Sequence, residues 1–307
     1  KPPRCRTLRL VNPSKKSAVR SIQRLSEDTR SVVLVDGDGC KAALRTIGGD
    51  FFSESRFLTS ISVSGTSITT IEDNFCSSCD LLTSLDLSGN THLTTIGTSF
   101  GSRCPVLRNL DLSNANSLTS IGSAFCFHAT LLQSLDLQGC TSLATIGDLF
   151  CYECPSLTGL GGLDSIVSIG DGFCSGCTSL TSFDCKEMAN LTSVGSSFLR
   201  ESPMTSLDFS GHTKLTTIGG QFCFQCTSLE SLHLSGNANL TSIGDAFCCG
   251  CPSLASIDLS GNISLSSIGV AFCFQCTSLT SLGGLDSVAS IGDGFCSGCT
   301  SLTSFDC

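Results

Sequence analysis

Cysteine is the residue type with the richest potential chemistry in this chain, which contains 22 cysteines among its 307 residues. Cys-x-x-Cys pairs can hold zinc, form disulfides or exchange thiols. Seven such pairs occur, at residues 76/79, 151/154, 174/177, 223/226, 248/251, 273/276 and 296/299. A four-thiolate zinc site needs converging ligands, whereas these pairs recur because a longer unit recurs, and Cys104 and Cys126 stand alone. We therefore expect buried, reduced structural thiols, with disulfides and a metal site as the alternatives.

Other catalytic arrangements are not evident. The four histidines are scattered, without a paired nucleophile or metal-ligand spacing, at positions His92, His128, His212 and His233. The stretch VVLVDGDGCKAAL (32–44) resembles a dinucleotide-binding loop but lacks the surrounding βαβ unit and the later acidic residue. We therefore expect a tight turn there, and a protein with no catalytic residues, no cofactor and no small-molecule ligand.

The cysteines belong to a repeat marked by an Ile-Gly or Val-Gly step, or by Ile71, with a phenylalanine four residues after the aliphatic residue. The pairs are Ile47/Phe51, Ile71/Phe75, Ile96/Phe100, Ile121/Phe125, Ile146/Phe150, Ile169/Phe173, Val194/Phe198, Ile218/Phe222, Ile243/Phe247, Ile268/Phe272 and Ile291/Phe295. Successive pairs are 23 to 25 residues apart, which is the length of one structural unit. The chain therefore contains about eleven copies of that unit.

The complete unit reads LxxLxLxxNxxLxxIGxxF, as in Leu82, Leu85, Leu87, Asn90 and Ile96. Apolar and other residues alternate in the Leu-x-Leu step, which is typical of a β-strand with one buried face. The later Phe and Cys, four residues apart, suit one or two helical turns facing inward. Because a single unit cannot bury its apolar side, the units must stack. We predict an α/β solenoid or horseshoe with a parallel sheet on one face and short helical or 3₁₀ segments on the other.

The asparagine of the unit is expected to point inward and to satisfy backbone groups at the turn after the strand. It is present at Asn90, Asn237 and Asn262, and other residues replace it at Ala115, Cys140, Met188 and His212. We therefore expect an interrupted asparagine ladder.

Charge divides the chain into two segments. Residues 1–45 contain eleven Lys or Arg and four acidic residues, whereas residues 46–307 contain six and twenty-two. We interpret 1–45 as a basic N-terminal capping segment, with a helix at about 17–26 and a strand at about 31–35, and 46–307 as the solenoid, cut within a repeat at its C-terminal end. An acidic body disfavours nucleic acid as a partner.

The run SIGDAFCCGCPSLASIDLS (242–260) resembles the BspA-like, or Treponema pallidum-type, leucine-rich repeat. The resemblance covers about residues 46–307, and it implies a leucine-rich-repeat solenoid. Proteins of that group are found on bacterial surfaces and in parasitic protists, where adhesion and protein binding are their usual roles. The resemblance thus implies a binding role.

An outward-facing residue lies between the two inward positions of each Leu-x-Leu step. In successive repeats it is Asp86, Asp111, Asp136, Asp184, Asp208, His233 and Asp258, with Gly161, Gly283 and Asp306 in the remaining ones. Carboxylates about 5 Å apart repel one another by about 0.8 kcal/mol per pair in a water-like dielectric. The column therefore predicts a cationic partner or Ca²⁺, with solubility of an exposed sheet as the alternative explanation.

A second candidate surface consists of aromatic residues between the paired cysteines. They are Phe127, Tyr152, Phe224 and Phe274. If the preceding phenylalanine faces the core, this position points outward or sideways. Exposed aromatic side chains at repeat spacing are candidate binding anchors, and packing against the adjacent repeat is the alternative.

These observations predict a non-catalytic interaction or assembly module that binds a protein with a basic surface on its acidic strand face. The alternatives are a cell-surface adhesin or recognition ectodomain and an architectural subunit of a large complex. No run of 18 apolar residues exists, so we expect no membrane span. Reduced cysteines favour an intracellular location, with the cell surface as the alternative.

Overall fold

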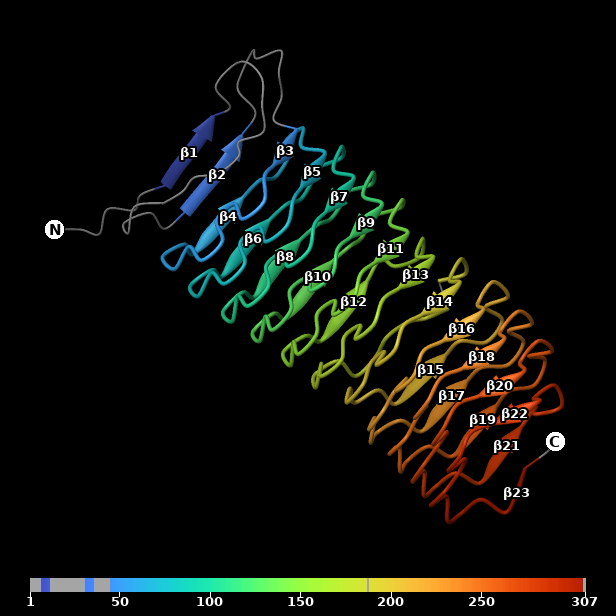
Figure 1. Ribbon diagram of the computed structural model, residues 1–307. Coiled ribbons are helices and arrows are strands. Elements are labelled where there is room, and N and C mark those ends of the chain that lie inside the picture. The colour runs from blue at the N-terminus through green and yellow to red at the C-terminus, as the bar shows by residue number, and fades with distance from the viewer. Residues whose placement is uncertain (1–6, 12–30, 36–44, 187, 306–307) are drawn as a thin grey trace. The chain divides into compact units, whose positions relative to one another are not determined.

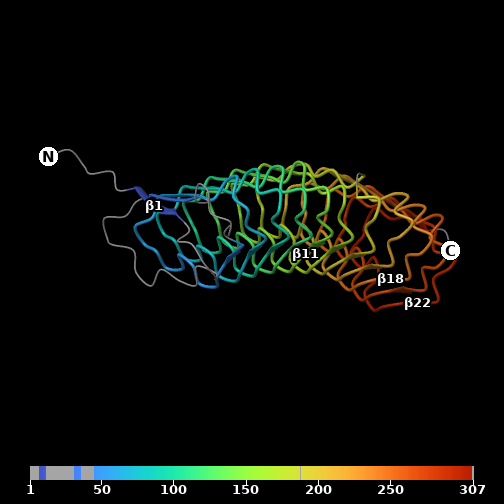
Figure 2. The same ribbon diagram turned by 90° about the horizontal axis from the view of Figure 1, so that it is seen from above.

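The computed structural model describes residues 7–11, 31–35, 45–186 and 188–305, and all of its regular elements are short parallel strands (Figure 1). The chain forms two compact units, Lys1–Leu163 and Asp164–Cys307. Viewed from above in Figure 2, successive turns within each unit follow one another as a stack. Most repeats contribute two strands, one to each of two sheets.

The larger sheet of the first unit contains seven strands in the order β1-β2-β4-β6-β8-β10-β12. Their bounds are β1 Thr7–Val11, β2 Ser31–Val35, β4 Ser60–Ser62, β6 Ser84–Asp86, β8 Asn109–Asp111, β10 Ser134–Asp136 and β12 Gly159–Gly161. All pairs are parallel, and equivalent positions of neighbouring repeats lie opposite each other, as Leu85 does with Leu110. The predicted helix at 17–26 and the loop at 36–44 lie outside the described residues.

The second sheet of the first unit is built from two-residue strands. They are β3 Thr46–Ile47, β5 Thr70–Ile71, β7 Thr95–Ile96, β9 Ser120–Ile121 and β11 Thr145–Ile146. In each strand the hydroxyl residue lies at the surface and the isoleucine is buried. This sheet and the larger one are the two walls that enclose the apolar core.

The second unit repeats this arrangement. Its two-residue strands are β13 Ser168–Ile169, β14 Ser193–Val194, β16 Thr217–Ile218, β18 Ser242–Ile243, β20 Ser267–Ile268 and β22 Ser290–Ile291. Its other sheet has the order β15-β17-β19-β21-β23, with bounds Ser206–Asp208, Ser231–His233, Ser256–Asp258, Ser281–Gly283 and Ser304–Phe305. The repeat before β15 forms no strand at Ser182–Asp184.

The repeat phenylalanines form a ring stack inside each unit. Phe100 and Phe125 lie 5.1 Å apart in nearly parallel planes, and Phe222 and Phe247 do the same in the second unit. These side chains are completely buried, as are most of the leucines and isoleucines of the repeat. The prediction that the repeat phenylalanines face the core is confirmed.

The predicted helical or 3₁₀ segments are wrong: the described residues contain no helix. Instead, the segment around the phenylalanine alternates between right- and left-handed backbone, with positive φ at Asn74, Cys76 and Ser78 in one repeat. The Asn74 and Ser78 amides donate to the following repeat, and the Cys76 amide donates to the preceding one, at 2.8 to 3.0 Å. These bonds join neighbouring repeats and take the place of i to i+4 bonds, which a segment of one or two turns nucleates poorly.

The glycine of the Ile-Gly step allows neighbouring repeats to approach closely. A Cβ atom built on Gly244 would lie 2.4 Å from the backbone nitrogen of Gly220, and one on Gly122 would lie 2.7 Å from the carbonyl carbon of Gly97. Real Cβ atoms essentially never come this close to backbone. At these positions the glycine of the Ile-Gly marker is therefore required sterically, whereas Glu72 occupies the same position in one other repeat.

The asparagine ladder faces inward as predicted. Asn90, Asn237 and Asn262 are buried, and Asn90 makes four hydrogen bonds of 2.7 to 3.0 Å, accepting from the amide and hydroxyl of Thr66 and donating to the carbonyls of Val63 and Leu87. At the equivalent position of another repeat, His212 meets the Cys185 carbonyl at 3.0 Å. Asn90 and Asn262 therefore tie their turns to the preceding one, and the ladder is interrupted where other residues replace asparagine.

Candidate functional site

Three aspartates form an unbroken column on the larger sheet of the first unit. Asp86, Asp111 and Asp136 lie opposite one another in the strand register, so they follow the strand spacing of about 4.8 Å. Asp86 is half-buried, and Asp111 and Asp136 are exposed. None of the three forms an ion pair with any residue that the structure describes. The column therefore presents uncompensated negative charge to solvent.

Each aspartate of the predicted column also has a structural task that the sequence analysis missed. Its Oδ1 accepts a hydrogen bond from the backbone amide two residues later, which is an Asx turn at the end of the strand. The pairs are Asp86–Ser88, Asp111–Ser113, Asp136–Gln138, Asp184–Lys186, Asp208–Ser210 and Asp258–Ser260, at 2.8 to 3.0 Å. The signal was present in the recurring Asp-x-Ser spacing. One carboxylate oxygen serves the turn; the other accepts a hydrogen bond from Ser62 in Asp86 and pairs with Lys186 in Asp208.

Local hydrogen bonds stabilise the charged form of two of these carboxylates. Partial burial opposes ionisation of Asp86, but hydrogen bonds from Ser88, Ser64 and Ser62 outweigh it and lower the pKa. Burial also opposes ionisation of Asp208, where bonds from Ser210 and Lys186 lower the pKa much further. Both groups are therefore anionic at neutral pH.

In the second unit the column is interrupted. Asp208, His233 and Asp258 are register neighbours on β15, β17 and β19, whereas Asp184 lies in a segment without strand pairing. His233 and Asp258 are exposed, as is Asp184. The predicted site residues thus form one complete column in the first unit and one interrupted column in the second.

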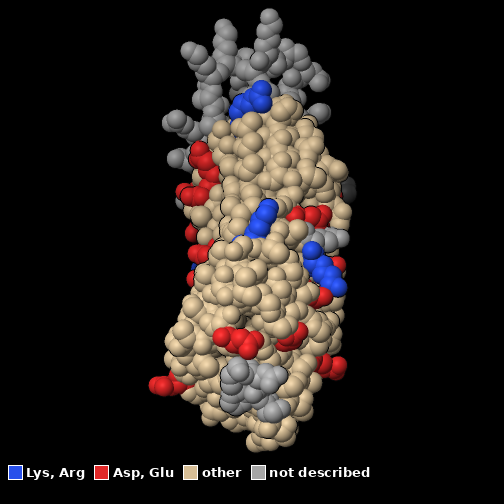
Figure 3. All heavy atoms as spheres, turned by 90° about the vertical axis from the view of Figure 1, so that its right-hand side faces the viewer, with Lys and Arg blue, Asp and Glu red and all other residues tan. Residues whose placement is uncertain are grey.

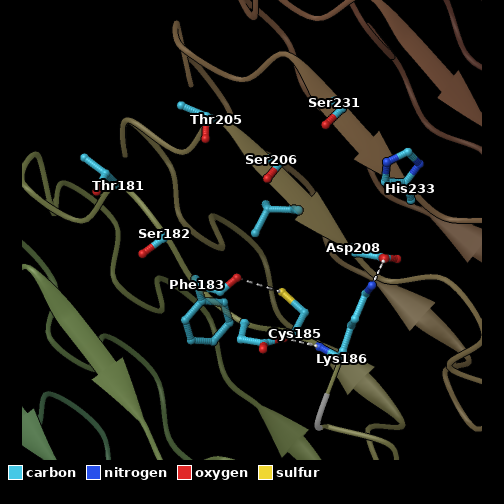
Figure 4. A pocket seen from close by; sticks show the side chains of 12 residues that line it. Thr181, Ser182, Phe183, Cys185, Lys186, Thr205, Ser206, Asp208, Ser231 and His233 are labelled. Carbon is cyan, nitrogen blue, oxygen red and sulfur yellow. Dashed lines mark hydrogen bonds and ion pairs between the residues drawn. The ribbon is translucent and has the colours of Figure 1, made fainter.

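A groove of about 580 Å³ lies at this interruption (Figure 4). The segment from Thr181 to Lys186 forms one wall, and β15 forms the other, with Ser231 and His233 beyond it. Lys186 reaches across the groove to Asp208, with 2.9 Å between Nζ and Oδ2. The groove therefore brings together three of the predicted residues, Asp184, Asp208 and His233, and adds a lysine that the sequence analysis did not select.

The aromatic residues form no continuous stripe. Phe127 and Tyr152 stack on each other at 5.5 Å, and Phe127 also contacts His128, which pairs with Glu153 at 3.2 Å. In the second unit the guanidinium of Arg200 lies over the ring of Phe224, while Phe274 lies two repeats further on. All four aromatic side chains are half-buried. Contacts with neighbouring repeats therefore occupy at least three of them.

The cysteines are structural donors. No disulfide joins any two of the nineteen described cysteines, and all except Cys249 and Cys296 are buried. In seven repeats the cysteine four residues after the phenylalanine donates its thiol hydrogen to a carbonyl of the preceding repeat at 2.9 to 3.1 Å. The pairs are Cys79–Phe52, Cys104–Cys76, Cys154–Cys126, Cys226–Leu199, Cys251–Cys223, Cys276–Cys248 and Cys299–Cys273. Ser202 makes the same bond where cysteine is missing.

Burial makes several thiols weaker acids, and the described residues contain no cluster of metal ligands. Burial raises the pKa of Cys126 well above its ordinary value, that of Cys140 to about 11 and that of Cys296 to about 12. No three His, Cys, Asp or Glu side chains in the described ranges converge as metal ligands do. Nor does any helix in that part of the chain have the length and apolar character to cross a membrane.

Stacked parallel strands, an inward asparagine ladder and a buried phenylalanine column define a leucine-rich-repeat solenoid. The chain belongs to the BspA-type leucine-rich repeat family, whose model matches it in six copies over residues 40–158, 144–272 and 238–307. No curated protein matches the sequence.

Solved structures with a similar fold include a leucine-rich repeat protein from Bacteroides ovatus, 21% identical, with 96% of this chain and 91% of that chain covered and a TM-score of 0.41. Another is a leucine-rich cell surface protein from Faecalibacterium prausnitzii, 20% identical, with 86% and 83% covered and a TM-score of 0.39. At these values the similarities carry no inference about partners.

Proposed function

We propose that this protein is a non-catalytic binding module whose acidic strand face binds a basic segment or surface of a partner protein. The residues proposed to contact the partner are Asp86, Asp111, Asp136, Asp184, Asp208, His233 and Asp258. The supporting observation is the uncompensated column Asp86–Asp111–Asp136. Its carboxylates repel one another by about 0.8 kcal/mol per neighbouring pair in water, and a bound cation relieves that repulsion.

The charge of the repeat region agrees with such a partner. Residues 46–307 contain six basic and twenty-two acidic side chains. The face in Figure 3 is mostly uncharged, with acidic groups mainly towards its margins and few basic ones. Long-range attraction to a cationic protein therefore accompanies the local recognition by the aspartate column.

The test must remove charge while preserving the Asx turns. We therefore choose the combined substitution Asp86→Asn, Asp111→Asn and Asp136→Asn, because the asparagine Oδ1 can still accept the turn hydrogen bond. The matched control is Glu54→Gln, Glu72→Gln and Glu153→Gln, which removes the same charge from exposed positions outside the column. The probe is a short labelled peptide of alternating lysine and threonine, and its Kd is measured by fluorescence anisotropy.

The column variant is expected to weaken binding by at least about tenfold, whereas the control variant changes it by less than about threefold. Equal effects of the two variants would show that the peptide senses only net charge, and the aspartates would then serve only turns and solubility.

A further inference from the structure

The groove of the second unit contains a strand edge that has no neighbouring strand. β15 pairs with β17, and the Phe209 amide donates to the His233 carbonyl at 2.8 Å on that side. On the other side, no backbone hydrogen bond within the described residues joins Ser182–Asp184 to Ser206–Asp208. An exposed edge of this kind is a template for pairing with another chain.

Equivalent positions in other repeats show which groups face the groove. The carbonyl of Asp86 accepts a bond from Val63 of the preceding repeat at 2.8 Å, and that of Asp111 accepts one from Leu87 at 3.0 Å. The carbonyl of Asp208 receives no such bond from Cys185 in the described structure. Backbone groups alternate in direction along a strand, so the amide and carbonyl of Ser206 face the same side as the carbonyl of Asp208.

The side chains around this edge suit an extended cationic segment. Hydroxyl groups of Thr181, Ser182 and Ser231 line the groove, and its acidic groups are Asp184 and Asp208. Lys186 already places an ammonium group on Asp208, and its side chain is 67% exposed. An exposed ion pair contributes little and exchanges readily, so a lysine or arginine of a partner can take its place.

We propose that an extended basic peptide of a partner protein adds as a parallel or antiparallel strand to the open edge of β15, with its cation replacing Lys186 on Asp208. This inference rests on the proposed function in that it assigns a binding mode to the same acidic strand face. Strand addition supplies backbone hydrogen bonds for affinity and side-chain contacts for selectivity. Lys186 then acts as an internal competitor.

The test uses the intact chain and the lysine–threonine peptide with backbone N-methylation at alternate residues. Two such peptides are made, one methylated at the odd-numbered residues and one at the even-numbered residues. Both retain every charge, but one of them lacks the amides that would donate to β15. The peptide that lacks those amides is expected to bind about tenfold more weakly than the unmethylated peptide. Ser206→Pro, which removes an amide on the groove side while leaving the bonds to β17, is expected to weaken binding similarly, and Ser206→Ala is its control.

Lys186→Gln is expected to tighten binding about threefold to fivefold, because it removes the internal competitor. Equal affinity of all three peptides overturns strand addition. The combined Asp86, Asp111 and Asp136 substitution separates the two proposals. If it weakens binding while Ser206→Pro and methylation have no effect, the proposed function stands and the groove inference is refuted. If Ser206→Pro and methylation weaken binding while it has no effect, the groove inference stands and the proposed function of the column is refuted. Self-association of the intact chain that Ser206→Pro abolishes would assign the edge to a second copy and also refute the groove inference.

Discussion

At the scale of single residues, each strand-face aspartate has two tasks. One carboxylate oxygen of Asp111 accepts the Ser113 amide at 2.8 Å, which ends the strand and begins the turn. The other oxygen is available to solvent or to a partner. Aspartate at this position is therefore explained locally by the turn, and its exposure and alignment, rather than its identity alone, support the binding proposal.

The lowered pKa of Asp86 makes a prediction about acid stability. A carboxyl whose folded pKa lies below its unfolded value contributes stability above the unfolded value and loses it as pH falls through the folded value. The free energy of urea-induced unfolding of the wild-type chain should therefore fall from about pH 4 downwards, whereas Asp86→Asn should show a flatter decline. Parallel curves for the two proteins would refute this assignment.

The asparagine ladder makes a second prediction at this scale. Asn90→Ala removes four hydrogen bonds and leaves the Thr66 amide and two carbonyls unsatisfied, so it should lower the free energy of unfolding by about 2 to 3 kcal/mol. Cys140 occupies the same position in another repeat and makes only a 3.5 Å contact to the Leu112 carbonyl. Cys140→Ala should cost clearly less in the same urea titration, and a similar loss for both variants would contradict the account.

At the scale of elements, the parallel strands and their buried residues could be predicted because Leu, Ile and Phe recur at a fixed period. The alternating left-handed segment could not, since non-glycine residues such as Cys76 occupy it in place of an obvious glycine pattern. A weak signal existed, because Gly101, Gly176 and Gly250 stand at these positions in other repeats. The phenylalanine–cysteine spacing suited a helix, but hydrogen bonds between repeats determined the backbone.

Close approach of the repeats predicts that alanine substitution at two glycines of the second unit has very different effects on stability. Gly244→Ala places a methyl group 2.4 Å from the Gly220 nitrogen and should destabilise the protein by about 3 kcal/mol, since backbone must move. A Cβ on Gly283 would have no atom within 4 Å, so Gly283→Ala should change stability by less than about 0.5 kcal/mol. Thermal and urea unfolding of both variants measure this difference, and equal losses would show that close approach is unimportant.

The left-handed positions predict that glycine is well tolerated there. Gln225 is exposed with φ of 55°, and relief of this conformation, about 1 kcal/mol, offsets the greater entropy of glycine in the unfolded chain. Gln225→Gly should therefore leave stability unchanged or raise it. Thr227→Gly, at an exposed neighbour outside the left-handed set, should cost about 1 kcal/mol. The alternating backbone would be contradicted by equal losses for the two substitutions.

At the scale of the whole molecule, the sequence predicts the stack of repeats and the acidic body. It predicts only part of the proposed binding surface. Regular repeats predict the column in the first unit well. The interruption at Ser182–Asp184 coincides with two irregularities, Phe183-Asp-Cys185-Lys186 in place of the usual Leu-Asp-Leu-Ser and a shortened repeat around Pro203. These irregularities mark a departure from the pattern, but its consequence, a groove beside an open strand edge, depends on packing that no periodicity describes.

Recognition of a basic segment by the strand-face carboxylates is tested most directly by mapping where the segment lies. Carbodiimide cross-linking joins carboxylates to lysines that are in contact, and mass spectrometry then identifies the joined residues of this chain and the lysine–threonine peptide. Within residues 45–163, we expect cross-links to concentrate at Asp86, Asp111 and Asp136. Cross-links distributed over Glu54, Glu72 and Glu153 as readily as over the column would contradict this expectation.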